Sequence, residues 1–169
     1  MPKADKQIFL LIALFSLMRL ATAPFFGLGV DEAHYALYGA FPDLSYVDHP
    51  PLVGWVHAVF IFLFGTNEFL VRLPAILLFA ATSYCCYQFM LRVTESVRLS
   101  LLGVFALNCT FMLNALAIML LPDSILLLLI FLLIFTTDRI ERAKKPVDFI
   151  LLGLIFGLMG LAKYTAILL

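Results

Sequence analysis

Two acidic segments in the first polar stretch of the chain carry residue types that could do chemistry. The first is Asp31-Glu32, and the second is Asp48-His49, which two prolines follow. A carboxylate can accept a proton or bind a divalent cation, and Asp beside His at a rigid turn can bind a metal ion or a phosphate. Structural roles are equally open. Asp31 can cap a helix with Glu32 in its first turn, and the second segment can be a solvated loop.

Three further ionisable residues lie beside apolar runs. Asp123 separates two such runs, where a carboxylate is costly unless it lines a wet cavity, has a partner or caps the next helix. Arg72 lies early in one run, and Lys163, with Tyr164 after it, lies in the outer third of the last. Each cation can either snorkel to the membrane interface or hold an anionic headgroup. Arg19 lies deeper in the first run, and the sequence assigns it no partner.

The composition places all these residues in a membrane protein. Apolar residues make up 64% of the 169 residues, 13% are charged, and the mean hydropathy is +1.08. Soluble domains average about 45–50% apolar and about 25% charged, so this chain has too few polar residues to cover a water-facing surface. A soluble protein and a disordered chain are therefore excluded. The 11 basic residues balance the 11 acidic ones, which argues against a nucleic-acid partner.

The apolar runs predict an all-α polytopic membrane protein with about five transmembrane helices, in a single module over residues 1–169. Runs over 7–26, 68–91 and 149–169 are each long enough to cross a membrane. The run over 99–135 would make a helix of about 55 Å, so it must double back, and the best turn lies between Asn114 and Asp123 with Pro122 as the breaker.

The segment 28–67 is predicted to be an outer loop that carries the candidate site. It is too polar to span, and its apolar part, 52–64, is too short for a full crossing. We therefore expect an interfacial or half-buried helix at 52–64, followed by a turn.

Basic residues are distributed unevenly between the two sides of the predicted bundle. One side holds Lys3, Lys6, Arg92, Arg98, Arg139, Arg142, Lys144 and Lys145, whereas the other holds only Arg72 and Lys163. Positive residues stay in the cytoplasm, so the N-terminus is predicted to be cytoplasmic. The carboxylates that then gather at the outer face are Asp31, Glu32, Asp43, Asp48, Glu68 and Asp123.

The order and spacing of these segments resemble the N-terminal part of the GT-C membrane glycosyltransferases. The similar branch contains protein O-mannosyltransferases, lipid A aminoarabinose transferases and the bacterial RgtA/B/C/D-like enzymes. The matching segments are Asp31 to Tyr35, Tyr46 to Leu52, Gly65 to Pro74, Pro122-Asp123-Ser124 and Gly160 to Thr165. Each segment alone is weakly specific, and the order of all of them carries the resemblance.

The resemblance implies an enzyme that moves a sugar from a polyprenyl-phosphate donor to a lipid A, glycan or protein acceptor outside the cytoplasm. It implies Asp31 as the catalytic carboxylate, with Glu32 beside it and Asp123 as a later acidic position. Asp48 is the candidate ligand of a divalent metal ion. The candidates for the lipid phosphate are Lys163, Tyr164, His49 and Arg72, and His49 stands where aminoarabinose transferases have Lys, so its contact weakens at high pH. The implied location is the bacterial inner membrane.

One departure from the family pattern keeps other functions open. Family members continue for several more spans, so we expect this chain to be a fragment, a truncated reading frame or one piece of a split protein. A catalytically inactive scaffold that binds lipid or partner helices is the alternative. A transporter fragment is disfavoured, because transporters place polar sites near the membrane midplane and these ionisable residues gather at one end.

Overall fold

The computed structural model describes residues 3–143 and 145–168, and every regular element in this part of the chain is helical. The long helices are α1 (Lys3–Thr22), α4 (Glu68–Thr94), α7 (Pro122–Ala143) and α8 (Pro146–Ala162). The shorter elements are η1 (Ala23–Phe25), α2 (Val30–Ala40), α3 (Leu52–Phe64), α5 (Val97–Cys109), α6 (Phe111–Ile118) and η2 (Tyr164–Leu168). The all-α class predicted from the apolar runs is confirmed.

Membrane-crossing length is reached by two of the described helices, Lys6–Phe25 and Glu68–Thr94. A third candidate arises if α5 and α6, which meet at a bend of 75°, count as one broken span. The helix α3 has the bounds predicted for the interfacial segment, but its position relative to a membrane stays a prediction. The total of about five crossings likewise stays a prediction.

The long apolar run doubles back at two points rather than one. The predicted break occurs at 119–121, and Pro122 begins α7 there. A further break at Thr110, which the sequence analysis did not predict, separates α5 from α6. Asn114 stabilises it, because its Nδ2 donates to the Asn108 carbonyl at 2.6 Å and its Oδ1 accepts from Arg19 at 2.8 Å. The buried Arg19 thereby finds the polar partner that the sequence did not assign to it.

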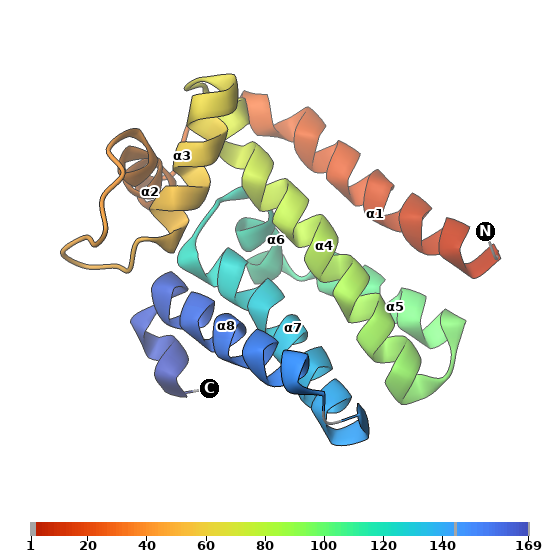
Figure 1. The fold of residues 1–169 in the computed structure, drawn as a ribbon. Helices are drawn as coiled ribbons and strands as arrows, with labels where there is room; N and C mark the ends of the chain where they lie inside the picture. The colour runs from red at the N-terminus through yellow and green to blue at the C-terminus, as the bar shows by residue number, and fades with distance from the viewer. Residues whose placement is uncertain (1–2, 144, 169) are drawn as a thin grey trace.

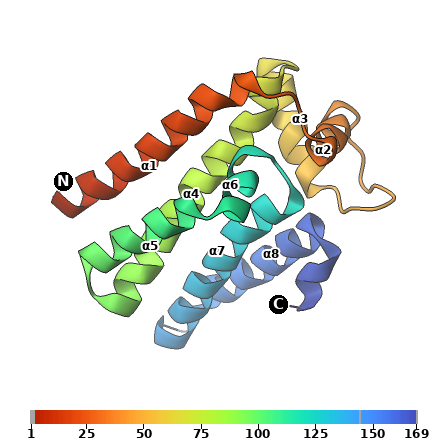
Figure 2. The same ribbon diagram turned by 180° about the vertical axis from the view of Figure 1, so that it is seen from behind.

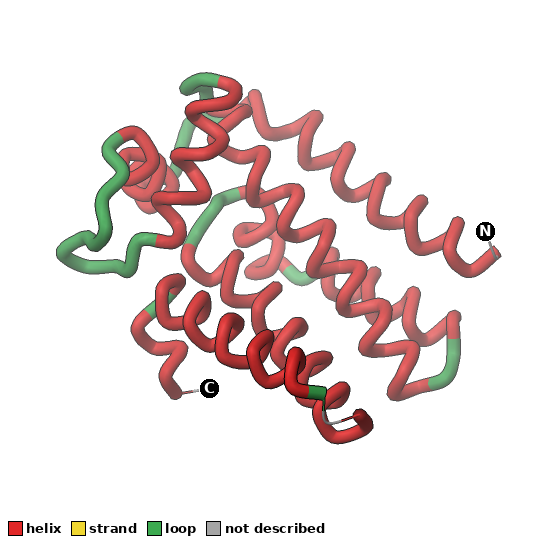
Figure 3. The backbone as a smooth tube through the Cα atoms, in the orientation of Figure 1, coloured by secondary structure: helices red, strands yellow, loops and turns green. Residues whose placement is uncertain are grey.

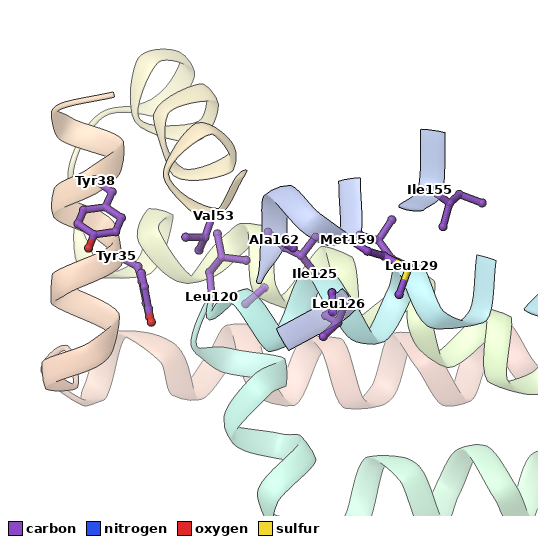
Figure 4. Packing of buried hydrophobic residues seen from close by; sticks show 12 residues of the cluster. Tyr35, Tyr38, Val53, Leu120, Ile125, Leu126, Leu129, Ile155, Met159 and Ala162 are labelled. Carbon is purple, nitrogen blue, oxygen red and sulfur yellow. The ribbon is translucent and has the colours of Figure 1, made fainter. Parts of the chain in front are cut away.

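Two apolar clusters hold the helices together. The smaller cluster, of Ile8, Cys86, Tyr87 and Val104, joins α1, α4 and α5. The larger one joins α2 and α3 to α7 and α8, and Figure 4 shows its side chains, including Tyr35, Tyr38, Val53, Leu120, Ile125 and Met159. Because Tyr35 and Tyr38 belong to this cluster, α2 is fixed against the bundle rather than hanging from a loose loop.

The candidate site and the basic turns lie at opposite ends of the bundle. The helices α2 and α3 lie at one end of the bundle, beside the start of α7 and the end of α8, and the 41–51 loop leaves the bundle there (Figures 1 and 3). The N-terminus and the turns from α4 to α5 and from α7 to α8 lie at the opposite end (Figure 2). The predicted gathering of the candidate site residues at one end is therefore seen, whereas the orientation in the membrane stays a prediction.

Candidate functional site

The helix α2 presents Asp31 as an exposed carboxylate. Gly29 is the N-cap of this helix, and the Glu32 carboxylate accepts the Gly29 backbone N–H at 3.1 Å. The alternative that Asp31 caps the helix is wrong, because α2 begins at Val30 with Gly29 as its N-cap, so Asp31 lies inside the first turn. Asp31 lies in the first turn, where the helix dipole favours negative charge, and it makes no hydrogen bond within the described residues.

Asp48 is the centre of a hydrogen-bond network between the 41–51 loop and α2. Its carboxylate accepts the Tyr38 hydroxyl, lies 3.1 Å from His34 Nε2, and lies 3.2 Å from His49 Nδ1. The Tyr38 hydrogen bond, with contributions from His49 and His34, holds the pKa of Asp48 well below its usual range. Asp48 is therefore ionised at physiological pH, and burial together with this hydrogen bond raises the pKa of Tyr38.

Tyr35 is a buried phenol beside His49. Its hydroxyl lies 3.0 Å from His49 Nε2, and only 8% of the residue is exposed. Burial raises the pKa of Tyr35 to about 12, and Asp31, Asp48 and Asp123 add to the effect. These three carboxylates come from α2, from the 41–51 loop and from the start of α7, and each lies near enough to Tyr35 for its charge to act on the phenol.

The loop is held in place by aromatic packing. Tyr46 stacks on Tyr38 with ring centroids 3.6 Å apart, and its hydroxyl lies 2.8 Å from the Tyr38 carbonyl. Trp55 on α3 donates its indole N–H to the Asp43 carbonyl at 2.8 Å. Gly54 is required beneath this stack, because a Cβ there would lie 2.9 Å from Tyr38 Cβ. These contacts position Asp48 and His49 against α2.

Glu32 and Arg72 form a buried ion pair. Arg72 donates through Nε and Nη2 to the two Glu32 carboxylate oxygens at 2.7 and 2.9 Å. Its remaining donors reach the carbonyls of Ala23, Phe26 and Gly27. A guanidinium has five N–H donors, so every one of them is used within the protein. The phosphate contact predicted for Arg72 stays a prediction, and it requires one of these bonds to be exchanged.

Asp123 and Lys163 form a second pair, which is half exposed. The Lys163 ammonium lies 2.7 and 2.8 Å from the two carboxylate oxygens of Asp123. The sequence placed Lys163 in the outer third of a last span over 149–169, and its position in the membrane stays a prediction. The helix α8 ends at Ala162, and Lys163 has an extended backbone between α8 and η2. Tyr164 begins η2, is 59% exposed, and makes no hydrogen bond within the described residues.

The residues around Asp48 contact one another and are not arranged around a shared ion. Among the described residues, no three His, Cys, Asp or Glu side chains are placed to share one ion. His34 and His49 instead direct ring nitrogens at Asp48 and at tyrosine hydroxyls. The divalent ion predicted at Asp48 therefore stays a prediction.

The sequence predicted candidate residues but not the side chains that they contact. His34 and Tyr38 were not assigned to the site. Their i, i+4 spacing puts them on one helix face, and His34 Nε2 lies 2.8 Å from the Tyr38 hydroxyl. The ion pairs of Glu32 with Arg72 and of Asp123 with Lys163 were not predicted either. These pairs could have been sought in the sequence, because a charged side chain beside an apolar run needs either water or an opposite charge.

Comparison with known proteins identifies the family. Residues 48–169 match the sequence profile of the dolichyl-phosphate-mannose-protein mannosyltransferase family. The matched part contains Asp48, Arg72, Asp123 and Lys163, and it begins after Asp31. No curated protein and no solved structure matches the chain. With its membrane-length helices and its cluster of carboxylates at one end of the bundle, the chain belongs to the dolichyl-phosphate-mannose-protein mannosyltransferase family, which consists of membrane glycosyltransferases with lipid-linked sugar donors.

Proposed function

We propose that this protein transfers a sugar from a polyprenyl-phosphate donor to an acceptor outside the cytoplasm. Family membership supplies the kind of reaction, glycosyl transfer from a lipid-linked donor. The observation that carries the finer proposal is the network in which Asp48 holds Tyr38, His34 and His49 against α2, the helix that presents the exposed Asp31. The Asp123–Lys163 pair lies at the same end of the bundle, where α7 begins and α8 ends. Such a cluster at the end of a membrane bundle offers a proton acceptor where a lipid-linked phosphate and a water-borne acceptor can meet.

In the proposed reaction, an acceptor hydroxyl attacks the anomeric carbon of the donor sugar. The bond from that carbon to the phosphate oxygen breaks, and polyprenyl phosphate leaves with the bonding electrons. Asp31 takes the proton from the hydroxyl as general base. It is suited to this role because it is exposed and has no hydrogen-bond partner in the described part of the chain.

Lys163 is the cation that we propose for the departing phosphate. An ammonium has three donors, and two suffice for the Asp123 oxygens at 2.7 and 2.8 Å, so a third is left for a phosphate oxygen. The other predicted groups are less available. Arg72 uses all its donors within the protein, and His49 has both ring nitrogens beside Asp48 and Tyr35. The exposed Tyr164 follows Lys163 directly, so its hydroxyl stays a second candidate for the phosphate.

Replacing Lys163 tests this assignment. Lys163→Met should weaken donor binding about tenfold or more, because it removes a hydrogen bond to a charged group. The melting temperature should change little, because a half-exposed ion pair contributes about 0–1 kcal/mol. Lys145→Met, at the opposite end of the bundle, is the matched control and should bind donor normally. Unchanged donor affinity with reduced stability would make Lys163 an interfacial anchor.

A catalytically inactive scaffold is the second candidate, and one observation favours it. Glu32 pairs with Arg72 and Asp123 pairs with Lys163, as expected of charges that only hold helices together. Incubating the purified protein with labelled polyprenyl-phosphate sugars, with and without acceptors, separates the two functions. Release of polyprenyl phosphate that depends on acceptor supports the enzyme, whereas donor binding without release supports the scaffold.

A further inference from the structure

A groove of about 640 Å³ is lined by residues of α1 and α5. Figure 2 shows the start of α1 and α5 at the end of the bundle opposite α2 and α3. The walls of the groove are mainly leucines, including Leu10 and Leu14 of α1 and Leu102 of α5. These side chains are 73%, 54% and 54% exposed, so the groove is an unfilled apolar surface along a membrane-length helix. Something apolar must cover this surface in a membrane.

The groove has one polar end and one apolar end. Gln7 and Arg98 line it near the start of α1 and the start of α5, where the N-terminus and the turn from α4 to α5 lie. Further along, Phe105 lines the groove, and its ring meets Phe15 of α1 edge-on at 5.9 Å. This polarity matches that of a phospholipid, whose charged headgroup lies at the interface and whose chains enter the hydrocarbon.

Arg98 is an arginine at this end of the bundle that makes no ion pair in the described part of the chain, although Glu95 lies three residues before it in the turn. The other arginines at this end have carboxylate partners: Arg92 and Arg142 contact Asp138, and Arg139 contacts Asp148. Arg98 is exposed and has no ion-pair or hydrogen-bond partner among the described residues. The exposed Lys6 precedes Gln7 on α1 and adds positive charge near the polar end of the groove. A neutral transmembrane helix would cover the leucines but would leave this charge without a counter-ion.

We propose that the groove between α1 and α5 binds an anionic phospholipid, with an acyl chain along the leucines and the phosphate at Arg98. Arginine suits this role because its planar guanidinium can bind two phosphate oxygens. The groove shares no residue with the proposed glycosyl-transfer site, so lipid binding there can be tested independently of donor recognition.

A tryptophan in the groove can report which lipid occupies it. The chain has a single tryptophan, Trp55, so Trp55→Phe with Leu10→Trp leaves one emitter at the groove. This protein is placed in phosphatidylcholine vesicles that contain increasing fractions of brominated phosphatidylglycerol, or of brominated phosphatidylcholine as the neutral comparison. Bromine quenches nearby tryptophan, so the ratio of the two quenching curves gives the preference for the anionic lipid.

The parent reporter should prefer phosphatidylglycerol about fivefold, the effect of one basic residue beside an anionic lipid. Arg98→Gln in the same background should lose the preference, and Arg98→Lys should keep most of it. The control Arg142→Gln, whose arginine is 74% exposed and paired with Asp138, should keep it fully. An equal preference in Arg98→Gln and Arg142→Gln would overturn the proposal. Absence of quenching by either lipid would also overturn it, because protein would then cover the groove.

Discussion

Glu32 and Arg72 are two opposite charges that are buried together. Glu32 is fully buried and Arg72 is 2% exposed, so each charge depends on the other for compensation. The pair joins α2 to α4 and holds the carbonyls of the connecting segment between α1 and α2. Glu32 is therefore better described as a positioning residue for α2 than as a carboxylate that contacts substrate.

Breaking this ion pair should lower the free energy of unfolding more than breaking any other ion pair among the described residues. Glu32→Gln is expected to lower the free energy of unfolding by about 3–5 kcal/mol, because it leaves the Arg72 charge buried and unpaired. Combining Glu32→Gln with Arg72→Met should cost less than the sum of the single changes, because each change already removes the shared interaction. Thermal unfolding of the four proteins in one detergent measures this, and additive losses would show that the two residues act independently.

His57 should make folding stability sensitive to acid. The residue is fully buried in α3, and neither ring nitrogen has a hydrogen-bond partner among the described residues. Burial lowers the pKa of His57 to about 4, and the nearby Leu120 backbone offsets only part of the effect. The unfolded chain binds a proton below about pH 6.5 while the folded protein does not, so stability should fall as the pH drops from about 6.5 to about 4.

The melting temperature between pH 7 and pH 4 tests the role of His57. His57→Leu should flatten the decline across this range, because no group remains there to take up the proton. Val53→Ala in the same helix should lower the melting temperature while keeping the slope, since Val53 is equally buried but does not titrate. An unchanged slope in His57→Leu would assign the acid sensitivity to other groups.

At this scale the sequence singled out candidate residues but not their partners. Asp31 and Asp48 were chosen from acidic segments of the first polar stretch and Asp123 from its position between two apolar runs, and their roles stay predictions. Their partners could not be predicted, because the pairs Glu32 with Arg72 and Asp123 with Lys163 each join residues that lie 40 positions apart. Such pairings depend on how helices pack, which residue types alone do not specify.

Helices were predicted best where apolar runs end at strong breakers. The predicted helix 52–64 has the observed bounds, and the run over 68–91 corresponds to α4, which continues to Thr94. The bend at Thr110 was missed, because no Gly or Pro marks it and its stabilisation comes from Asn114 and Arg19. Local sequence signals predict breaks made by backbone chemistry, whereas this break depends on tertiary contacts.

The contact between α2 and α3 should be intolerant of any added atom. At Gly39 a Cβ would lie 2.3 Å from His57 Cβ and 2.9 Å from the backbone nitrogen of Ala58, so the helices would have to separate. Gly39→Ala should therefore lower the free energy of unfolding by about 1–3 kcal/mol. It should also reduce transferase activity, because α2 carries Asp31.

Gly153→Ala in α8 is the matched control. A Cβ there meets nothing within 4 Å, so alanine should be neutral or should stabilise the helix by up to about 1 kcal/mol. The comparison uses thermal unfolding of both variants. Equal behaviour of the two variants would show that α2 and α3 are not packed as closely as the structure has them.

The whole molecule separates its charges along the bundle axis. The candidate site lies at one end, and the basic turns between α4 and α5 and between α7 and α8 lie at the other (Figure 1). Lys144, one of the basic residues counted in the sequence, lies outside the described residues. The asymmetry predicts that the basic end faces the cytoplasm.

Reporter fusions test this orientation directly. A reporter active only in the cytoplasm should work when fused in the turn between α7 and α8, and one active only outside should work when fused near Asp43. Fusions at the same two sites with the reporters exchanged are the controls and should be inactive. The opposite pattern would place the carboxylate cluster on the cytoplasmic side and rule out an extracytoplasmic acceptor.

The most direct test of the proposed function is the turnover of Asp31→Asn. Asparagine keeps the size of the side chain and removes the base. Because Gly29 is the N-cap and Glu32 accepts its N–H, stability should change by no more than about 1 kcal/mol of dipole interaction. Sugar transfer from a polyprenyl-phosphate donor should fall by roughly 10²–10⁴-fold at unchanged donor affinity. Asp43→Asn in the neighbouring loop should transfer normally. Near-normal turnover in Asp31→Asn would contradict the assignment and leave Asp123 or Asp48 as the base.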